Sequence, residues 1–483
     1  MVLAFPFSRL TAARTSDCVE ASARLVPPSP GLLARMKARL REDSAKAGLK
    51  GFGMAGKVPR PGLSKGKLRG RNDGLMSAAP VPGPPDLITR PRVQLRGTIQ
   101  TLVLLVDFSD RPHDPENTPE YYRQMLFGDA GVFPTGSMRE YYRQVSHYDA
   151  ASGTGIDVQG EVVGWLRLPR TSAAYTNNSF GREDTYPNNA QGMAFDAVQA
   201  AIAAGVDFRP YDCLGENTVT ALFIIHAGEG AEQTERKSDF WSLKWTIPDG
   251  IVVAPHLSVN TFLTVPETCH IGVCAHEWGH LAAQWADYYD TDEPPYQSNG
   301  LGDFCLMSSG SWGNNGLCPT NPNGMLRMFH NWVDIVDLSA GESTVTLSPA
   351  AEGGQLLRIH NPAVMNNKQY ILAEYRRREG QDHFLPDAGL AIYVVDEAIE
   401  DVNQETHLAI ELIQADNQRD LAKMLYGNRG DSRDLYPYLQ NHSAGLATSP
   451  ALDLPGTTKW SGVTIDVLDQ AGGEQMRVRV KVN

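Results

Sequence analysis

The chain has 483 residues, 42% of them hydrophobic, and a formal net charge of −13. That length exceeds what one hydrophobic core usually supports, so we expect two or three folded units. No run of about 18 apolar residues is present, which argues against a membrane-spanning helix and predicts a soluble folded body.

Charge is distributed unevenly along the chain. The first 97 residues carry 18 Lys and Arg against 6 Asp and Glu, whereas the remainder carries 25 against 50. A basic leader before an acidic body is typical of a nucleic-acid arm, a targeting segment or a pro-region lying on an acidic cleft. We favour the pro-region and expect no nucleic-acid partner. Salt-sensitive DNA binding by residues 1–95 would support the arm instead.

Residues 1–95 contain one segment with helical periodicity, Gly31–Lys46, which has a short apolar stripe among basic residues. The Gly- and Lys-rich stretch and the Pro-rich stretch that follow cannot build a core and are typical of a linker. We therefore predict a basic, partly disordered pro-region and linker over residues 1–95. Residues 1–7 are apolar but too short for a signal-peptide core, so no export signal is identified.

Residues 96–335 mix two periodicities. The pattern predicts helices at Met138–His147 and Gln191–Ala204, and strands at Thr98–Phe108, Gly160–Leu168 and Thr218–Ala227. This mixture predicts an α+β catalytic domain with a mixed sheet.

Residues 336–483 alternate apolar and polar side chains in short runs. Strands are predicted at Thr344–Leu347, Tyr370–Tyr375, Leu390–Val395, Leu408–Ile413, Val463–Val467 and Met476–Val482. Antiparallel strands at this spacing suggest a mostly β, sandwich-like C-terminal domain. The predicted fold class of the whole chain is α+β.

The segment Ile271–Ala282 contains the pattern His-Glu-x-x-His. On a helix, His276 and His280 lie one turn apart on the same face, and their imidazoles suit Zn²⁺. Glu277 can reach a water on the fourth zinc position and act as the general base and acid of peptide hydrolysis. The pattern also arises by chance on surface helices. The apolar neighbours, Trp278 and Leu281 among them, predict a buried helix instead, in which two histidines need a shared partner.

A third zinc ligand has to come from a turn after the helix. If the helix continued straight, Asp287 would lie about 10 Å along the axis from His280 and could not share an ion with it. The chain must therefore turn after about Ala283, and we predict Asp287 as the third ligand with Asp290 as the alternative. Further on, Met307 enters a predicted tight turn, which is typical of the methionine beneath the metal in metzincins.

Taken together, these signatures resemble the immune inhibitor A-like metallopeptidases over about residues 97–480. The resemblance rests on the order of several segments rather than on one motif. They are Val103–Asp110, Phe127–Asp129, Gly136–Tyr142, Gly160–Gly164, His276–His280, Asp287–Asp292, Leu306–Gly313, Glu374–Arg376 and Pro386–Leu390.

The resemblance implies a zincin/metzincin-like zinc endopeptidase that is secreted, begins with a removable pro-region, and holds calcium as a structural ion. It also implies an aspartate as the third zinc ligand, which favours Asp287. We expect protein or peptide substrates and a monomeric chain. Family members typically read His-x-x-Gly-x-x-Asp, whereas this chain has Ala283 at the glycine position and one extra residue before Asp287. A non-catalytic zinc-binding member of the same fold is therefore the alternative.

Overall fold

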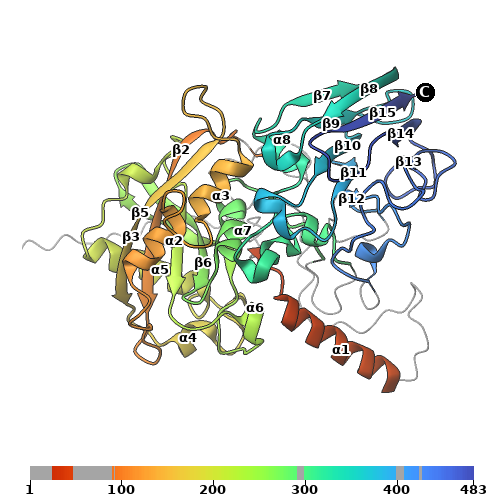
Figure 1. The fold of residues 1–483 in the computed structure, drawn as a ribbon. Coiled ribbons are helices and arrows are strands. Elements are labelled where there is room, and N and C mark those ends of the chain that lie inside the picture. The colour runs from red at the N-terminus through yellow and green to blue at the C-terminus, as the bar shows by residue number, and fades with distance from the viewer. Residues whose placement is uncertain (1–23, 47–89, 92, 291–297, 399–406, 424–426) are drawn as a thin grey trace, which may run out of the picture.

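The computed structural model describes residues 24–46, 90–91, 93–290, 298–398, 407–423 and 427–483 (Figure 1). Within these ranges, no helix combines the length and the apolar character that crossing a bilayer requires. The five cysteines in them are free thiols, with the Cys269 and Cys274 sulfur atoms 3.5 Å apart. Cys18 lies outside the described residues.

A twisted sheet organises the first half of the chain. Its strands lie in the order β1-β5-β6-β4-β2-β3, of which β3, β2, β4 and β6 run parallel while β5 and β1 run antiparallel to their neighbours. The bounds are β1 Arg24–Leu25, β2 Gly97–Asp107, β3 Ile156–Arg167, β4 Leu222–His226, β5 Leu243–Ala254 and β6 Leu257–Pro266. Residues 102–106 of β2 are all fully buried, as expected for a parallel strand covered on both faces.

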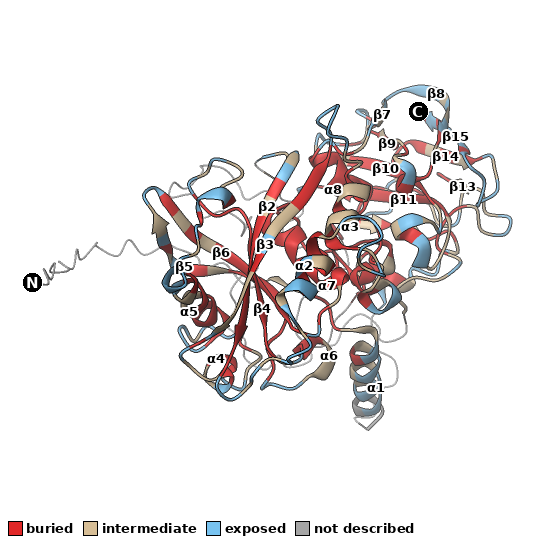
Figure 2. Ribbon diagram, turned by 60° about the vertical axis from the view of Figure 1, so that its left-hand side comes forward, coloured by how far each residue is buried: buried red, intermediate tan, exposed pale blue. Residues whose placement is uncertain are grey.

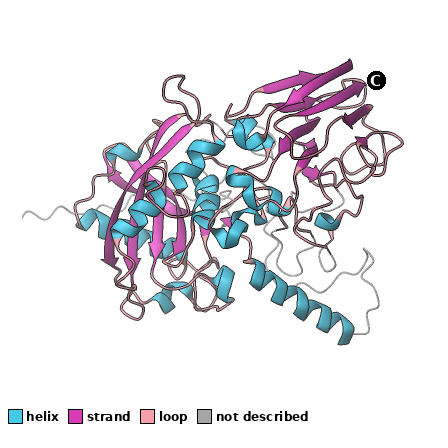
Figure 3. Cartoon of the chain, viewed as in Figure 1, coloured by secondary structure: helices cyan, strands magenta, loops and turns pink. Residues whose placement is uncertain are grey.

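Helices cover both faces of this sheet (Figures 2 and 3). The α-helices are α1 Pro30–Lys46, α2 Pro119–Phe127, α3 Met138–Val145, α4 Ser172–Thr176, α5 Ala190–Ala203, α6 Ala231–Thr234, α7 Ile271–Leu281 and α8 Gly324–Phe329. Side chains of α4 and α5 share a core with one face, and those of α2, α3 and α7 share a core with the other. A capping box fixes the start of α3: Ser137 Oγ accepts from the Glu140 amide, and Glu140 accepts from the Ser137 amide.

Two further sheets form the C-terminal part. Their orders are β12-β11-β10-β9-β7 and β13-β14-β15-β8. The bounds are β7 Ile335–Leu338, β8 Gly341–Leu347, β9 Leu356–Ile359, β10 Gln369–Arg376, β11 Gly389–Asp396, β12 Ile410–Leu412, β13 Ser443–Ala444, β14 Val463–Val467 and β15 Met476–Val482. Alternate residues of β10 face opposite sides: Leu372 packs against the core of the first half, whereas Ile371 packs against the second sheet. The five-stranded sheet is therefore the middle layer.

The predicted α+β class and every strand and helix named from the sequence are confirmed, with ends that move by up to four residues. The sequence patterns do not identify β5 and β6. Strand β5 carries Pro248, Asp249 and Gly250 in its middle, where the register with β6 shifts, so the alternation that marks a strand is broken there.

Candidate metal centre

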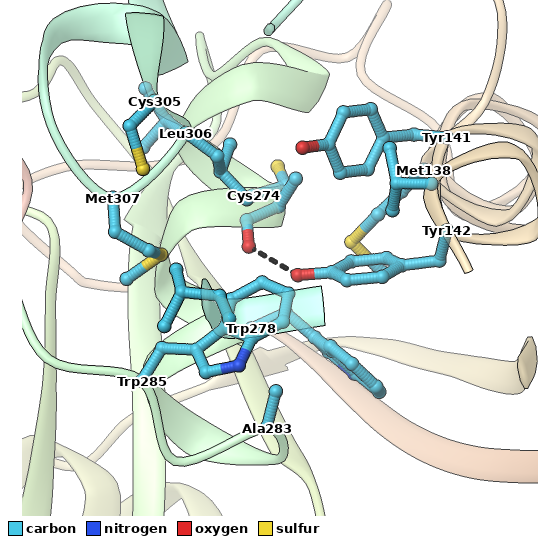
Figure 4. Close-up of a cluster of buried hydrophobic side chains, with 14 of the residues drawn as sticks. Met138, Tyr141, Tyr142, Cys274, Trp278, Ala283, Trp285, Cys305, Leu306 and Met307 are labelled. Atoms are coloured by element: carbon cyan, nitrogen blue, oxygen red, sulfur yellow. Dashed lines mark hydrogen bonds between the residues drawn. The ribbon is translucent and has the colours of Figure 1, made fainter. Parts of the chain in front are cut away.

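Helix α7 carries the two predicted histidine ligands and is buried along its whole length. The Tyr142 hydroxyl from α3 donates to the Ala275 carbonyl oxygen at 2.7 Å (Figure 4). The Trp278 indole donates to Thr101 Oγ1 of β2 at 3.0 Å. These bonds satisfy polar groups inside an apolar core, so they fix the helix against both the sheet and α3.

His276 and His280 point their Nε2 atoms at each other across 3.1 Å. The Nδ1 atom of His276 lies 2.9 Å from the Leu306 carbonyl oxygen, and that of His280 lies 2.7 Å from the Trp285 carbonyl oxygen. A carbonyl can only accept a hydrogen bond, so each Nδ1 carries the proton and each Nε2 presents a lone pair inward. This is the tautomer that a metal ligand needs.

Asp287 completes the group because the chain turns directly after α7. The helix ends at Leu281, and Gln284 has a left-handed backbone with φ of 58°. Asp287 Oδ1 then lies 3.0 Å from His280 Nε2 and 3.2 Å from His276 Nε2. The residue that makes the turn is therefore Gln284 rather than Ala283. Asp287 follows Gln284 by three positions, just as the aspartate follows the glycine in the pattern His-x-x-Gly-x-x-Asp. The extra residue is accommodated before the turn.

The three donor atoms have the spacing that one zinc ion requires. Two ligands bound tetrahedrally at 2.0–2.1 Å lie about 3.3 Å apart, close to the 3.0–3.2 Å seen here. The group of donors that could hold a metal at this place contains Asp287 and not Asp290, although Asp290 is also buried. Asp287 Oδ2 makes no hydrogen bond with any described residue. The donor set fits zinc.

Glu277 is next to His276 of this group of donors and is fully buried. Neither of its carboxylate oxygens has a hydrogen-bond partner among the described residues. Burial raises the pKa of Glu277 well above its usual range, the negative charge of Asp287 adds to this rise, and the Lys244 ammonium opposes it. A buried carboxyl with a raised pKa and no hydrogen-bond partner among the described residues is suited to general acid and base chemistry.

Met307 packs beneath α7, where the sequence predicted it. A Cβ added to Gly279 would lie 3.0 Å from Met307 Sδ and 2.9 Å from the Trp285 ring, so the glycine allows both side chains to approach the helix (Figure 4). The residue before the methionine, Leu306, supplies the carbonyl that orients His276. Nothing in the sequence singled out the two orienting carbonyls, because any residue type carries one.

Strand β1 also reaches this centre and was not predicted. It pairs with β5 and lies beside α7, and the Tyr289 hydroxyl donates to the Leu25 carbonyl oxygen. Figure 1 shows the N-terminal segment in red beside α7, continuing into α1. Two residues are too few for a periodic pattern, so the sequence carries no signal for this strand.

Comparison with known proteins gives a family match. The model of the immune inhibitor A peptidase M6 catalytic domain matches residues 94–335, which is half of the chain. Immune inhibitor A of Bacillus thuringiensis subsp. alesti is 29% identical over 289 residues, covering 50% of this chain and 41% of that protein. The pre-pro-metalloprotease PrtV of Vibrio cholerae serotype O1 (strain M66-2) is 27% identical over 313 residues, covering 52% of this chain and 33% of its own length.

The chain therefore matches less than half the length of these curated relatives. The family match over residues 94–335 contains α7 and the loop that carries Met307. Membership of a metallopeptidase family implies a metal ion, and the donors described above provide a place for it. The chain belongs to the immune inhibitor A peptidase M6 family.

Proposed function

We propose that the chain is a zinc-dependent endopeptidase with His276, His280 and Asp287 as ligands and Glu277 as the general base and acid. The observation that carries the proposal is the convergence of three correctly spaced donor atoms beside a buried carboxylate that has no hydrogen-bond partner among the described residues. The turn at Gln284 and Met307 beneath α7 support a metzincin-like centre.

The residues of the chain divide the work of hydrolysis. A bound zinc ion would polarise the scissile carbonyl and acidify the attacking water. Glu277 accepts the proton of that water and delivers it to the nitrogen of the leaving amine. The Leu306 and Trp285 carbonyls keep both imidazoles oriented while charge develops, so the donors need no rearrangement during the reaction.

The domain organisation expected from the sequence is part of the proposal: a pro-region and linker over residues 1–95, a catalytic domain over 96–335 and a β domain over 336–483. The position of β1 on the centre supports a pro-region that covers the site in the intact chain. We further propose a secreted monomer acting on proteins or peptides, in line with the name of its relative PrtV, a pre-pro-metalloprotease.

Calcium, which the sequence resemblance implies as a structural ion, has one candidate site in the part of the chain that the structure describes. Oxygens of Asp416, Asp431 and Asp434 lie within 4.8 Å of one another. Asp303 is a poorer candidate, because it is 3.3 Å from the Arg429 guanidinium. Oxygen-only donor sets are the ones that calcium prefers.

A comparison of the parent with Glu277→Gln tests the catalytic proposal. Both proteins are loaded with zinc, treated briefly with trypsin to cut the Lys- and Arg-rich residues 47–71, and assayed on casein. We expect equal zinc content by mass spectrometry and a loss of roughly 10²–10⁴-fold in activity in the variant. A parent that holds one zinc ion and remains inactive after the cut would leave the non-catalytic zinc-binding alternative as the better description.

A further inference from the structure

No motif in the sequence marks His330, a buried histidine directly after α8 that is only 2% exposed. Figure 1 shows α8 where the first half of the chain meets the C-terminal sheets. The His330 ring stacks on that of Trp332 with centroids 4.7 Å apart, and its centroid is 5.8 Å from that of Trp285. Because Trp285 belongs to the turn after α7, His330 packs against the segment that connects the proposed zinc ligands.

Both ring nitrogens of His330 bond to the backbone of distant segments. The Leu95 amide donates to Nδ1 at 3.1 Å, and Nε2 lies 3.2 Å from the Ala283 carbonyl oxygen. An amide can only donate and a carbonyl can only accept, so Nδ1 presents a lone pair and Nε2 carries the proton. Burial lowers the pKa of His330 to about 3, which keeps the ring neutral near pH 7. This tautomer is the reverse of that in His276 and His280, whose Nδ1 atoms carry the proton.

The Leu95 side of this contact is fixed by further bonds. Leu95 is buried two residues before β2 begins, and its carbonyl accepts from the Trp332 indole at 3.0 Å. The Trp332 amide in turn donates to the Arg327 carbonyl of α8 at 2.9 Å. Both backbone groups of Leu95 therefore bond to the segment just after α8. A proton on Nδ1 of His330 would face the Leu95 amide, and two buried donors facing each other are costly.

The Ala283 carbonyl lies in the turn that brings the third donor to the first two. Ala283 is fully buried just beyond the end of α7, where carbonyls have no amide partner further along the helix. Nε2 of His330 supplies the donor that such a buried carbonyl needs. The next residue, Gln284, turns the chain, and the Trp285 amide donates back to the Gly279 carbonyl at 3.1 Å. The helix thus holds one end of the turn, and His330 holds the other.

The position of this turn matters for the metal because Asp287 follows Ala283 by only four residues. Asp287 Oδ1 lies 3.0 Å from His280 Nε2 and 3.2 Å from His276 Nε2. Ligand distances at a metal site tolerate a change of only about 0.2 Å. A turn that is free to move would therefore hold the third ligand out of place for much of the time.

We propose that His330 is a positioning residue of the metal centre, whose Nε2–H holds the Ala283 carbonyl and so fixes the turn that carries Asp287. This inference rests on the zinc endopeptidase proposed above and adds a residue on which its metal affinity depends. His330 acts through the backbone and is not itself one of the donors. One imidazole thus joins the start of β2, the end of α8 and the turn after α7.

Two substitutions separate the two bonds of the ring. In His330→Gln the side-chain amide nitrogen reaches the place of Nε2 and can donate to Ala283. In His330→Asn the shorter side chain reaches only the place of Nδ1, where its oxygen can accept from Leu95. Zinc affinity is measured on the full chain by titration with a competing chelator. We expect His330→Asn to bind zinc about tenfold more weakly than the parent and His330→Gln to bind it nearly as well.

The comparison between the two amides is the decisive result, because replacing any buried histidine costs stability. Equal zinc affinity in the two variants, or a larger loss in His330→Gln, would overturn the proposal. Co²⁺ in place of zinc gives a second measurement, since its visible absorption spectrum depends on the geometry of its ligands. The spectrum should change in His330→Asn and stay like that of the parent in His330→Gln. The same spectrum in both variants would contradict the role of the Ala283 bond.

His226→Asn is the matched control. His226 is fully buried, its Nδ1 lies 3.1 Å from the Ala227 carbonyl oxygen, and its ring centroid is 4.8 Å from that of Phe240. It therefore shares burial, a backbone carbonyl and an aromatic neighbour with His330, at a different place in the fold. Its zinc affinity should match that of the parent. A loss as large as that in His330→Asn would show a general effect of stability and contradict the proposal.

If neither amide variant folds, the tautomer of His330 in the parent decides the question. Nitrogen chemical shifts of the ¹⁵N-histidine-labelled protein should show a neutral ring that is protonated at Nε2. A proton on Nδ1 would leave no donor for Ala283 and overturn the proposal. A parent that binds no zinc would instead contradict the endopeptidase proposed above, and the tautomer would still test the bond to Ala283. The two failures are thus distinguishable.

Discussion

Two buried clusters of charged side chains differ in how their oxygen atoms are used. In the metal centre, three of the four carboxylate oxygens of Glu277 and Asp287 have no hydrogen-bond partner among the described residues. In the second cluster, which connects α8 to β10, all four oxygens of Glu374 and Asp382 are bonded. The donors there are Arg327, Arg376, Tyr393 and the Asn321 amide.

The comparison separates a ligand site from a structural one. Buried polar groups are costly unless they are paired, so a cluster that leaves its oxygens unpaired has to be stabilised by something that binds there. A cluster whose carboxylate oxygens are all paired within the protein needs no ligand for them and serves to hold its elements together. The sequence shows acidic and basic residues at both places, and only the three-dimensional arrangement distinguishes them.

The largest effect is expected from removing one donor of the metal centre. Asp287→Ala should lower zinc affinity by at least about tenfold to a hundredfold and abolish peptidase activity, since losses of that size already follow changes around metal ligands. Asp290→Ala is the matched control, because that residue is equally buried but lies outside the donor group. Zinc titration with a competing chelator measures both. Zinc loss in Asp290→Ala alone would transfer the third ligand to Asp290.

Mutations in the second cluster should lower the free energy of unfolding rather than the affinity for zinc. Glu374→Gln removes the charge between Arg327 and Arg376, and breaking such a buried pair costs roughly 3–5 kcal/mol of unfolding free energy. Urea unfolding measures this loss, and the zinc content of the folded protein should not change. Asp337→Asn, which breaks an exposed pair with Arg358, should cost at most about 1 kcal/mol. A smaller loss in Glu374→Gln than in Asp337→Asn would contradict the distinction.

The proposed calcium site is intermediate between these two clusters in how far its carboxylate oxygens are paired. Asp431 is paired with Arg433 at 2.6 Å, yet Asp416 Oδ2 is buried without a hydrogen bond. Burial, together with the charges of Asp431 and Asp416, raises the pKa of Asp434 to about 7. Because this pKa is raised on folding, its contribution to stability is present below the unfolded value near 4 and is lost as pH rises towards 7.

Calcium should reverse that loss. At a hundredfold excess over its Kd, it should stabilise the protein by about 2.7 kcal/mol near pH 7 and much less at pH 4. Thermal unfolding with calcium and with a chelator provides the measurement. Asp434→Asn should remove both the pH-dependent loss and the calcium effect. Equal melting temperatures with calcium and chelator at pH 7 would mean that Arg433 satisfies the cluster by itself.

Much of the fold and half of the centre could be predicted from the sequence, for a physical reason. Helical periodicity places His276 and His280 on one face, and alternation identifies strands such as β14 and β15 to the residue. The parts that were missed depend on contacts far apart in the chain. Examples are the Leu306 carbonyl on His276, which is 30 residues away, and β1 on β5, more than 200 residues away.

The smallest effect, at the turn after α7, concerns which residue replaces the family glycine. The sequence pattern assigns that position to Ala283, whereas the left-handed backbone is at Gln284, where a side chain costs about 1–2 kcal/mol. Gln284→Gly should therefore leave the unfolding free energy unchanged or raise it by up to about 1 kcal/mol, because the loss of strain exceeds the added entropy of glycine. Ala283→Gly gains no relief and should lower it by about 0.5–1 kcal/mol. If urea unfolding instead showed Ala283→Gly to be more stable than Gln284→Gly, the left-handed residue of the turn would be Ala283. The position of Asp287 would then need a new explanation.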